Sequence, residues 1–378
     1  MGRRGRRSGA AAAVLGLAAG AAVLAAASRA RAPADGRPSA AAALAAGGRG
    51  PRGYHKGVGH LRRAERADKC RDATGSEQCV TRTLPGGAEE HLPFDEWLAD
   101  RAAHVGYNPD LGAEARWGLP DHVDWRDHGV VSPTKDQGMC GSCWTFASSA
   151  ALESSVALAT GHLMTLSEQQ ILDCTPNPKH CGGTGGCQGG IVQIAYDKIN
   201  EFGGLSGEWQ YPYLSYTGKD EKCAFQPGMI QSMSSFRGKI AYNELPINDA
   251  QSLMAAVAAL GPVAISVDAS EWHLYKGGVF DQCNQDKPDI DHAVVLVGYG
   301  TDETDGDYWL VRNSWGAGWG EDGYIRIRRT ADESGRCGVD TTPKDGVACD
   351  GDPPKQTVCG TCGILTDSVF PELAHATA

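Results

Sequence analysis

The stretch QGMCGSCWTFASSA, residues 137–150, decides how this chain is interpreted. It places Cys143 directly after a tight Gly141-Ser142 turn and at the start of a helix-forming run. A thiol at a helix N-terminus faces the positive end of the helix dipole, which lowers the thiol pKa and favours the nucleophilic thiolate. Cys143 is therefore the first candidate nucleophile.

A nucleophilic thiol needs a base and a group that orients this base. His292 stands at the start of an apolar, β-branched run, and Asn313 stands at the end of another. Both runs are typical of buried strands, and two strand ends can present their side chains to one cleft. The order Cys, His, Asn therefore predicts a thiol hydrolase.

Several further motifs occur in the order of one enzyme family. They are LPDHVDWRDHGVVSPTKDQGMCGSCWTFA at 119–147, LSEQQILDC at 166–174, GCQGG at 186–190, GPVAISVDA at 261–269, DHAVVLVGYG at 291–300 and NSWGAGWGEDGYIRI at 313–327. On these motifs, residues 119–378 resemble the papain family, and within it the cathepsin L-like cysteine peptidases. An atypical propeptide and a cysteine-rich insertion near the C-terminus depart from the family pattern.

The order of the expected elements indicates an α+β fold. Helices are expected first and strands afterwards, without alternation. The expected helices are 143–158, 167–173 and 191–202, and the expected strands are 263–269, 293–300, 308–314 and 324–329. The resemblance implies two lobes, one helical and one an antiparallel β-barrel-like sheet, with the active-site cleft between them.

The resemblance also implies the catalytic roles. Cys143 and His292 would form a thiolate–imidazolium pair, and Asn313 would hold the imidazole by its other nitrogen. The side-chain amide of Gln137, six residues before Cys143, would bind the oxyanion together with a backbone N–H. Trp315 would shield the His–Asn hydrogen bond from water.

A substrate-binding set follows from the same register. The substrate main chain would lie against Gly189 and Gly190, where absent side chains let a peptide backbone approach. The pocket for the second residue before the scissile bond would be largely apolar. Its expected residues are Ile191, Val192, Ser266, Ile290 and Asp291, with Asp367 at the base. Asp367 would either accept Arg or Lys or be a solvated carboxylate beside the insertion, so the specificity stays open.

Composition indicates a targeting segment (1–32), and the resemblance implies a propeptide (33–118) and a peptidase domain (119–378) that contains an insertion (337–361). Residues 1–53 contain a single acidic residue and are mostly Ala, Gly and Arg, which favours a cleaved signal peptide over an organellar transit peptide. The helical motif typical of cathepsin L propeptides is not recognisable, so inhibition by residues 33–118 stays open. Cys70 and Cys79 could close a small loop there, and Phe94 and Trp97 could anchor a short helix.

Charge and cysteine content restrict the partners and the compartment. From residue 119 onward, 34 Asp and Glu stand against 17 Lys and Arg, a net charge of −17 that disfavours nucleic acid and anionic membranes. Eleven of the 13 cysteines lie in this part, enough for one free thiol and five disulfides, which indicates a secretory or endomembrane route. We expect a lysosomal, vacuolar or secreted protein without metal or cofactor.

The resemblance implies three of the disulfides, which are Cys140–Cys187, Cys174–Cys223 and Cys283–Cys362. Spacing alone does not connect the remaining Cys181, Cys337, Cys349 and Cys359. A zinc site built from Cys337, Cys349, Cys359 and Cys362 is the alternative, but an oxidising route favours disulfides. The insertion at 337–361 could gate substrates or be a disulfide-stapled surface loop, and the loop is our expectation.

We therefore expect a monomeric cysteine endopeptidase that is made as a zymogen. It would hydrolyse peptide and protein substrates through an acyl-thioester, with its own propeptide as a possible inhibitor. No His-bearing loop follows Gly190, which argues against a carboxydipeptidase. The alternatives are a peptide ligase or transpeptidase of the same fold, and a non-catalytic homologue.

Overall fold

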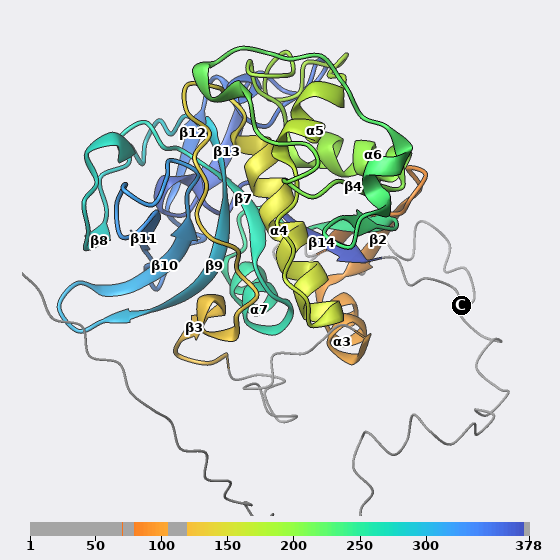
Figure 1. Ribbon diagram of the computed structural model, residues 1–378. Helices are drawn as coiled ribbons and strands as arrows, with labels where there is room; N and C mark the ends of the chain where they lie inside the picture. Colours follow the sequence, from red (N-terminus) through yellow and green to blue (C-terminus); the bar gives the residue numbers. More distant parts are fainter. Residues whose placement is uncertain (1–69, 71–78, 105–118, 374–378) are drawn as a thin grey trace, which may run out of the picture. The chain divides into compact units, whose positions relative to one another are not determined.

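The computed structural model describes residue 70, residues 79–104 and residues 119–373 (Figure 1). The expected targeting segment 1–32 and most of the expected propeptide lie outside the described residues. Among the helices of the described residues, none is long and apolar enough to cross a membrane.

Helix α4 (Cys143–Thr160) lies at the centre of the described structure (Figure 1). Residues 144–157 are all buried, as expected for a helix that is apolar or small on every side. It packs against strands on one side and against α5 (Glu168–Cys174) and α6 (Val192–Phe202) on the other. It ends at Gly161, whose left-handed backbone (φ 73°) allows its N–H to cap the carbonyl of Ala157.

The expected helices and strands are confirmed within a few residues. Ser167 begins α5 as an N-cap, because its hydroxyl accepts the N–H of Gln170 at 3.0 Å. The four expected strands are β7 (Val263–Val267), β9 (His292–Asp302), β10 (Gly306–Arg312) and β11 (Tyr324–Arg328). The α+β class is therefore confirmed, with α4, α5 and α6 preceding most strands of a mostly antiparallel sheet.

The sheet has the strand order β2-β1-β6-β14-β7-β9-β10-β11-β8, and β3 pairs with β9. Only β11 and β8 pair in parallel. One apolar core lies between the sheet and α7, and a second lies between the sheet, α4 and α6. The other strands are β3 (Val123–Asp124), β4 (Gly204–Leu205), β5 (Phe236–Arg237), β6 (Ile240–Glu244), β8 (Val279–Phe280) and β14 (Ser368–Leu373), and the remaining helix of this part is α7 (Ala250–Leu260).

Short 3-10 helices connect these elements. They are η1 (Trp125–His128), η2 (Ser215–Thr217), η3 (Pro227–Gln231), η4 (Trp272–Leu274), η5 (Pro343–Asp345) and η6 (Thr361–Gly363).

Residues 79–104 extend the edge of this sheet. They form β1 (Cys79–Thr83), β2 (Glu89–Pro93) and α3 (Phe94–His104). β1 pairs antiparallel with β6, and α3 packs against α7. Trp97, expected to anchor a short helix, is 1% exposed and donates its indole N–H to Asn243 at 2.9 Å. Phe94 and Trp97 therefore belong to the core of the sheet.

The insertion forms a separate hairpin of β12 (Cys337–Asp340) and β13 (Gln356–Cys359). All cysteines in it are in disulfides, so the zinc alternative is wrong. The three pairs implied by the resemblance are present, and the four cysteines left open pair as Cys181–Cys349 and Cys337–Cys359. The six disulfides of the described residues are Cys70–Cys79, Cys140–Cys187, Cys174–Cys223, Cys181–Cys349, Cys283–Cys362 and Cys337–Cys359.

Candidate active site

Cys143 is the first residue of α4 and the only free cysteine among the described residues. The turn before it is fixed by the Cys140–Cys187 disulfide and by the N–H of Gly141, which donates to the carbonyl of Cys187 at 2.9 Å. A side chain at Gly141 would place its Cβ 2.6 Å from that carbonyl oxygen. Only glycine fits this approach, so the turn presents the thiol in one position.

His292 begins β9 and Asn313 directly follows β10, so adjacent strands bring the two side chains together. Nε2 of His292 lies 2.8 Å from Oδ1 of Asn313. Because a carbonyl oxygen only accepts, Nε2 carries the proton of this bond, and Nδ1 is the nitrogen left for Cys143. Asn313 is itself fixed, since its Oδ1 also accepts the N–H of Ser314 at 2.7 Å.

The environment lowers the pKa of Cys143. Burial alone would raise it, but the hydrogen bond and the positive charge of His292 outweigh burial, and the N–H of Ala293 adds to their effect. The helix N-terminus acts in the same direction. The thiol therefore lies in surroundings that favour the thiolate.

Aromatic rings cover the pair of His292 and Asn313. Trp315 stacks on the imidazole with ring centroids 5.0 Å apart, and Trp272 meets it edge-on at 6.1 Å. Trp319 stacks on Trp272 at 6.1 Å. His273 stacks on Trp315 at 5.2 Å and is exposed. Trp272 had no motif around it, whereas Trp319 belongs to the NSWGAGW segment.

The side chain of Gln137 is held from several directions. Its Oε1 accepts the hydroxyl of Ser314 at 2.6 Å, and its Nε2 donates to the carbonyl of Cys140 at 2.9 Å. The hydroxyl of Tyr213 donates to the backbone carbonyl of Gln137 at 2.8 Å and lies 2.8 Å from Oγ of Ser142. The sequence reasoning missed Tyr213, and it also missed Ser314, which lies in the quoted NSWGAGWGEDGYIRI segment.

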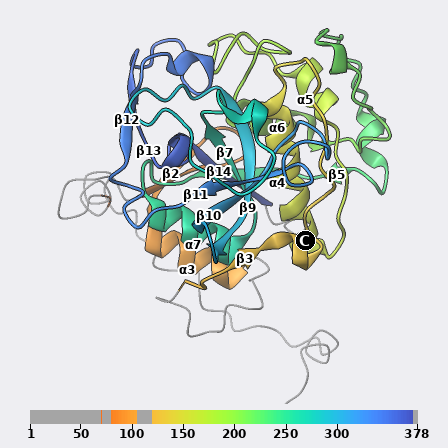
Figure 2. The ribbon, with the colours of Figure 1, turned by 90° about the vertical axis from the view of Figure 1, so that its left-hand side faces the viewer.

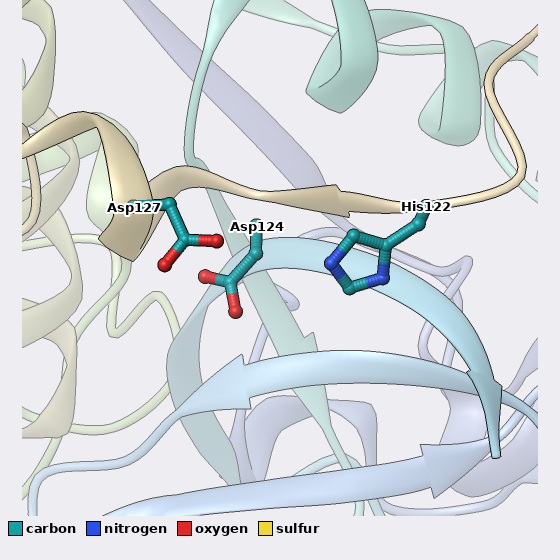
Figure 3. A group of neighbouring side chains, drawn as sticks. All are labelled: His122, Asp124 and Asp127. Carbon is teal, nitrogen blue, oxygen red and sulfur yellow. The ribbon is translucent and has the colours of Figure 1, made fainter.

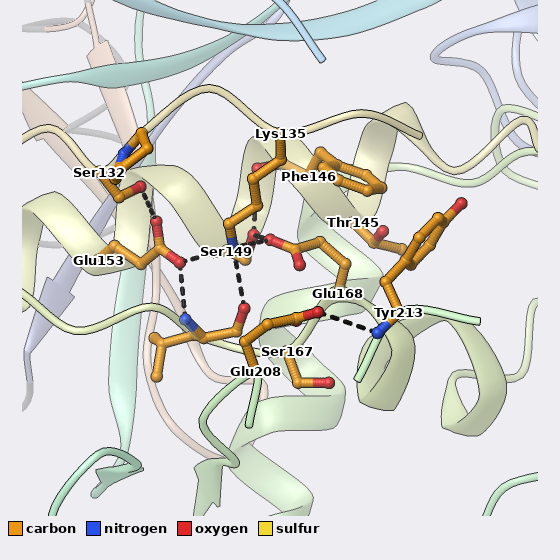
Figure 4. Close-up of polar contacts among 12 residues, drawn as sticks. Ser132, Lys135, Thr145, Phe146, Ser149, Glu153, Ser167, Glu168, Glu208 and Tyr213 are labelled. Atoms are coloured by element: carbon orange, nitrogen blue, oxygen red, sulfur yellow. Dashed lines mark hydrogen bonds and ion pairs between the residues drawn. The ribbon is translucent and has the colours of Figure 1, made fainter. Parts of the chain in front are cut away.

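A buried charge network lies behind this turn (Figure 4). The ammonium of Lys135 pairs with Glu153 at 2.9 Å and with Glu168, and the Glu153 and Glu168 side chains are at most 1% exposed. Burial alone would lower the pKa of Lys135, but the two carboxylates raise it above its ordinary value. Glu208, which accepts the N–H of Tyr213 at 2.9 Å, has a pKa raised to about 7 by burial and by the charge of Glu168.

The two glycines expected to face the substrate are also required by packing. A Cβ at Gly190 would lie 2.8 Å from the ring of Trp144. Gly189 has φ 95°, and a Cβ there would lie 2.3 Å from the carbonyl of Gly182.

The expected pocket residues lie on elements of both lobes. Val192 starts α6 with Ile191 as its N-cap, Ser266 lies on β7, and Ile290 and Asp291 precede β9. Val192, Ser266 and Ile290 are buried, at 2%, 5% and 0% exposure. Oδ1 of Asp291 accepts the N–H of Ala269 at 2.9 Å, which fixes the loop before His292.

Asp367 lies next to Ser266, as the register implied. Its Oδ2 accepts the hydroxyl of Ser266 at 2.8 Å, and its Oδ1 accepts the side-chain amide of Gln193 at 3.0 Å. Burial raises the pKa of Asp367, although both hydrogen bonds oppose this. Gln193 also donates to Glu244 at 2.9 Å. Both carboxylate oxygens of Asp367 are thus already engaged, and Gln193 and Glu244 were missed.

One group among the described residues has the spacing of a metal site (Figure 3). One ligand atom each of His122, Asp124 and Asp127 lies within 4.8 Å of the others. Both carboxylate oxygens of Asp124 accept hydrogen bonds from Arg126, at 2.6 to 3.0 Å. Because this guanidinium already neutralises Asp124, we assign no metal to the group.

Comparisons with known proteins agree with this geometry. The sequence model of the protein family described as papain family cysteine protease matches residues 119–346 of this chain. A cathepsin L-like protein of Caenorhabditis elegans is 44% identical over 227 residues, which are 59% of this chain and 63% of the relative. Procathepsin L of Mus musculus is 40% identical over 228 residues, 59% of this chain and 64% of the relative. The chain therefore spans less than two thirds of the length of these curated relatives.

Two solved structures are similar in fold as well. The bromelain protease from Ananas comosus, in complex with the E64 inhibitor, has a TM-score of 0.53 and 35% identity, covering 68% of this chain and 100% of that one. Digestive procathepsin L 3 from the larval midgut of Tenebrio molitor has a TM-score of 0.52 and 34% identity, covering 75% and 80%.

Proposed function

The chain belongs to the papain family of cysteine proteases, and from this membership and the site geometry we propose that it is a cysteine endopeptidase acting through an acyl-thioester of Cys143. One observation carries the proposal. The free thiol at the start of α4 contacts His292, whose other ring nitrogen is held by Asn313 at 2.8 Å. A non-catalytic homologue would lack a member of this set.

The reaction takes place in two halves. The thiolate of Cys143 attacks the scissile carbonyl carbon and forms a C–S bond, and His292 gives its Nδ1 proton to the amine as the C–N bond breaks. A water molecule then gives a proton back to Nδ1 and attacks the thioester, which releases the carboxylic acid and regenerates the ion pair. Asn313 keeps the imidazole in one orientation throughout.

Two donors would bind the oxyanion of each tetrahedral intermediate. The backbone N–H of Cys143 is among the first of α4, which have no acceptor within the helix. The amide of Gln137 donates one of its two N–H bonds to Cys140, which leaves the other for the oxyanion. A single such donor contributes about 3 kcal/mol to transition-state stabilisation.

The expected layout of targeting segment, propeptide and peptidase domain is part of the proposal. Residues 79–104 pack on the sheet edge, where Arg82 and Arg101 pair with Glu372, a side chain that is 2% exposed. A cut between residues 105 and 118 would therefore leave 79–104 bound, because its release would break both ion pairs and expose the buried Trp97 to water. Inhibition of the cleft would then come from residues outside the described ranges.

The six disulfides indicate an extracellular or endomembrane protein. Within that range we propose a lysosomal, vacuolar or secreted enzyme that acts on peptide and protein substrates as a monomer.

The test is labelling with a thiol-directed epoxide together with hydrolysis of a denatured protein. We expect one label per chain, loss of hydrolysis in proportion to labelling, and neither in Cys143→Ala. Proportional loss of hydrolysis with the label on another residue would overturn the assignment. Added amine nucleophiles would reveal ligation as a product of their mass, whereas we expect only hydrolysis products.

A further inference from the structure

The insertion is hydrogen-bonded to the segment that precedes His292. Gln285 donates its side-chain amide to the carbonyls of Arg336 and Gly360, at 2.8 and 3.2 Å. Thr342 donates its hydroxyl to Asp289 at 2.9 Å. Residues 285–291 lead directly into His292, so the hairpin of β12 and β13 is fixed next to the catalytic strand.

The tip of the insertion crosses to the helical lobe (Figure 2). Cys349 forms a disulfide with Cys181, which lies in the loop between α5 and α6. The N–H of Gly182 donates to the carbonyl of Ala348 at 3.0 Å, and the N–H of Asp350 donates to the carbonyl of Lys179 at 2.7 Å. The loop 179–183 and the tip 346–350 thus form one unit, which we term the inter-lobe bridge.

The inter-lobe bridge contacts residues of the expected substrate pocket on both lobes. A Cβ at Gly182 would lie 2.8 Å from Cγ2 of Ile191 and 3.0 Å from the carbonyl oxygen of Gly190. A Cβ at Gly346 would lie 1.8 Å from the carbonyl oxygen of Ile290. Gly182 and Gly346 also touch each other, because a Cβ at Gly182 would lie 2.4 Å from the carbonyl oxygen of Gly346. Continuous contact therefore runs from Ile191 on one lobe to Ile290 on the other.

The burial of the pocket agrees with this coverage. Gly190 is buried although it was expected to be open to a substrate backbone, and Ile290 is 0% exposed. The insertion carries the disulfides expected of a stapled loop, and it also contacts both lobes. Spacing could not show this, since it depends on the pairing of Cys181 with Cys349.

We propose that the inter-lobe bridge is a specificity element that narrows the cleft beyond the pocket for the second residue before the scissile bond. The inference rests on the proposed function, because it assumes that a peptide lies between Gly190 and Ile290. With the bridge intact, substrate residues ahead of this pocket meet the Cys181–Cys349 disulfide. Peptides with more than two residues before the scissile bond are therefore cleaved more slowly than shorter ones, and opening the bridge removes this difference.

The disulfide makes this restriction removable. Cys349 is partly exposed, so a small thiol can reach it. Two equivalents of thiol would convert the disulfide into two cysteine thiols and release one equivalent of oxidised thiol. The bridge would then be held only by the hydrogen bonds of Gly182 and Asp350 and by surface ion pairs, which are weak.

The test is a series of peptides that share one cleavage site and carry two, three, four or six residues before it. The wild-type chain is compared with Cys181→Ser/Cys349→Ser, and with a variant that joins Asp340 to Gln356 by Asn-Gly and carries Cys181→Ser. Asp340 and Gln356 pair directly, so this two-residue turn suits the hairpin. Cys174→Ser/Cys223→Ser is the control, because it removes a disulfide that lies within the helical lobe.

We expect kcat/KM of the wild-type chain and of the control to fall about tenfold or more between two and four residues. In both bridge variants, kcat/KM should vary by no more than about twofold across the peptide series. The same contrast should appear as Kd of the peptides for Cys143→Ala with and without the bridge, which needs no turnover. A flat wild-type series, or an equal fall in the bridge variants, would overturn the inference. If no peptide is cleaved but the Kd values for Cys143→Ala still differ with and without the bridge, the result would count against the proposed endopeptidase activity alone.

Discussion

Replacing Glu208 by Gln should remove part of the pH dependence of stability. Burial and the charge of Glu168 raise the pKa of Glu208 from 4.5 to about 7 in the folded protein. Between these values the folded state holds a proton that the unfolded state releases. The stabilisation is therefore complete below pH 4.5 and is lost as the pH rises through 7.

The size of the effect follows from the pKa difference. The difference between a pKa of 4.5 and one of about 7 for Glu208 corresponds to about 3.4 kcal/mol of unfolding free energy, at about 1.36 kcal/mol for each tenfold change in the acid constant. Glu208 is only partly buried, so solvent screening reduces this to roughly 1.5 kcal/mol. For a domain of this size that is a difference in Tm of roughly 3–6 °C between pH 4.5 and 7.5.

The assay is thermal unfolding at both pH values in a Cys143→Ala background, which excludes self-digestion. Gln keeps an acceptor for the N–H of Tyr213 but carries no titrating group. We expect the variant to lose roughly 3–6 °C of the Tm difference between the two pH values. The control is Glu201→Gln, an exposed partner of Lys198 on the surface of α6, which should change nothing. An unchanged Tm difference in Glu208→Gln would refute the reasoning.

Four further results are expected. Tyr213→Phe removes the hydroxyl that binds the carbonyl of Gln137, so kcat should fall roughly fivefold at unchanged KM; an unchanged kcat would contradict this role. Preference for Arg over Leu as the second residue before the bond should rise with pH as Asp367 ionises, and because burial raises the pKa of Asp367 this rise should lie above the usual carboxyl range. Asp367→Asn should abolish the rise, and a pH-independent ratio would mean purely apolar specificity. Trp97→Ala should cost about 3–5 kcal/mol of unfolding free energy, measured by urea denaturation. Finally, kcat/KM against pH should be a bell, and a rate that keeps rising above neutral pH would exclude the thiolate–imidazolium pair.

Local signals in the sequence indicated the candidate catalytic residues and most elements. The CGSCW turn, the N-cap Ser167, the strand before Asn313 and the strand that begins at His292 depend on neighbouring residues, so motif and periodicity suffice for them. The fold class followed from the same local patterns, because helices precede strands along the chain.

Other features depend on contacts between distant residues and could not be predicted. Spacing does not determine the partner of Cys181, since four open cysteines allow three pairings. Trp97 pairs with Asn243, and Gln193 bridges Asp367 to Glu244, through contacts that exist only after the sheet has formed. A short strand such as β1 has no periodic signal strong enough to indicate its partners.

The most direct test of the proposed chemistry is the capture of the acyl-enzyme. The protein would be mixed with a peptide ester, quenched in acid within milliseconds to seconds, and analysed by intact mass and peptide mapping. We predict a mass increase equal to the acyl group, located on Cys143, and no increase in Cys143→Ala, whose kcat/KM should be below about 10⁻³ of wild type. An acyl group on another residue, or turnover by Cys143→Ala above that level, would contradict the assignment of Cys143 as the nucleophile.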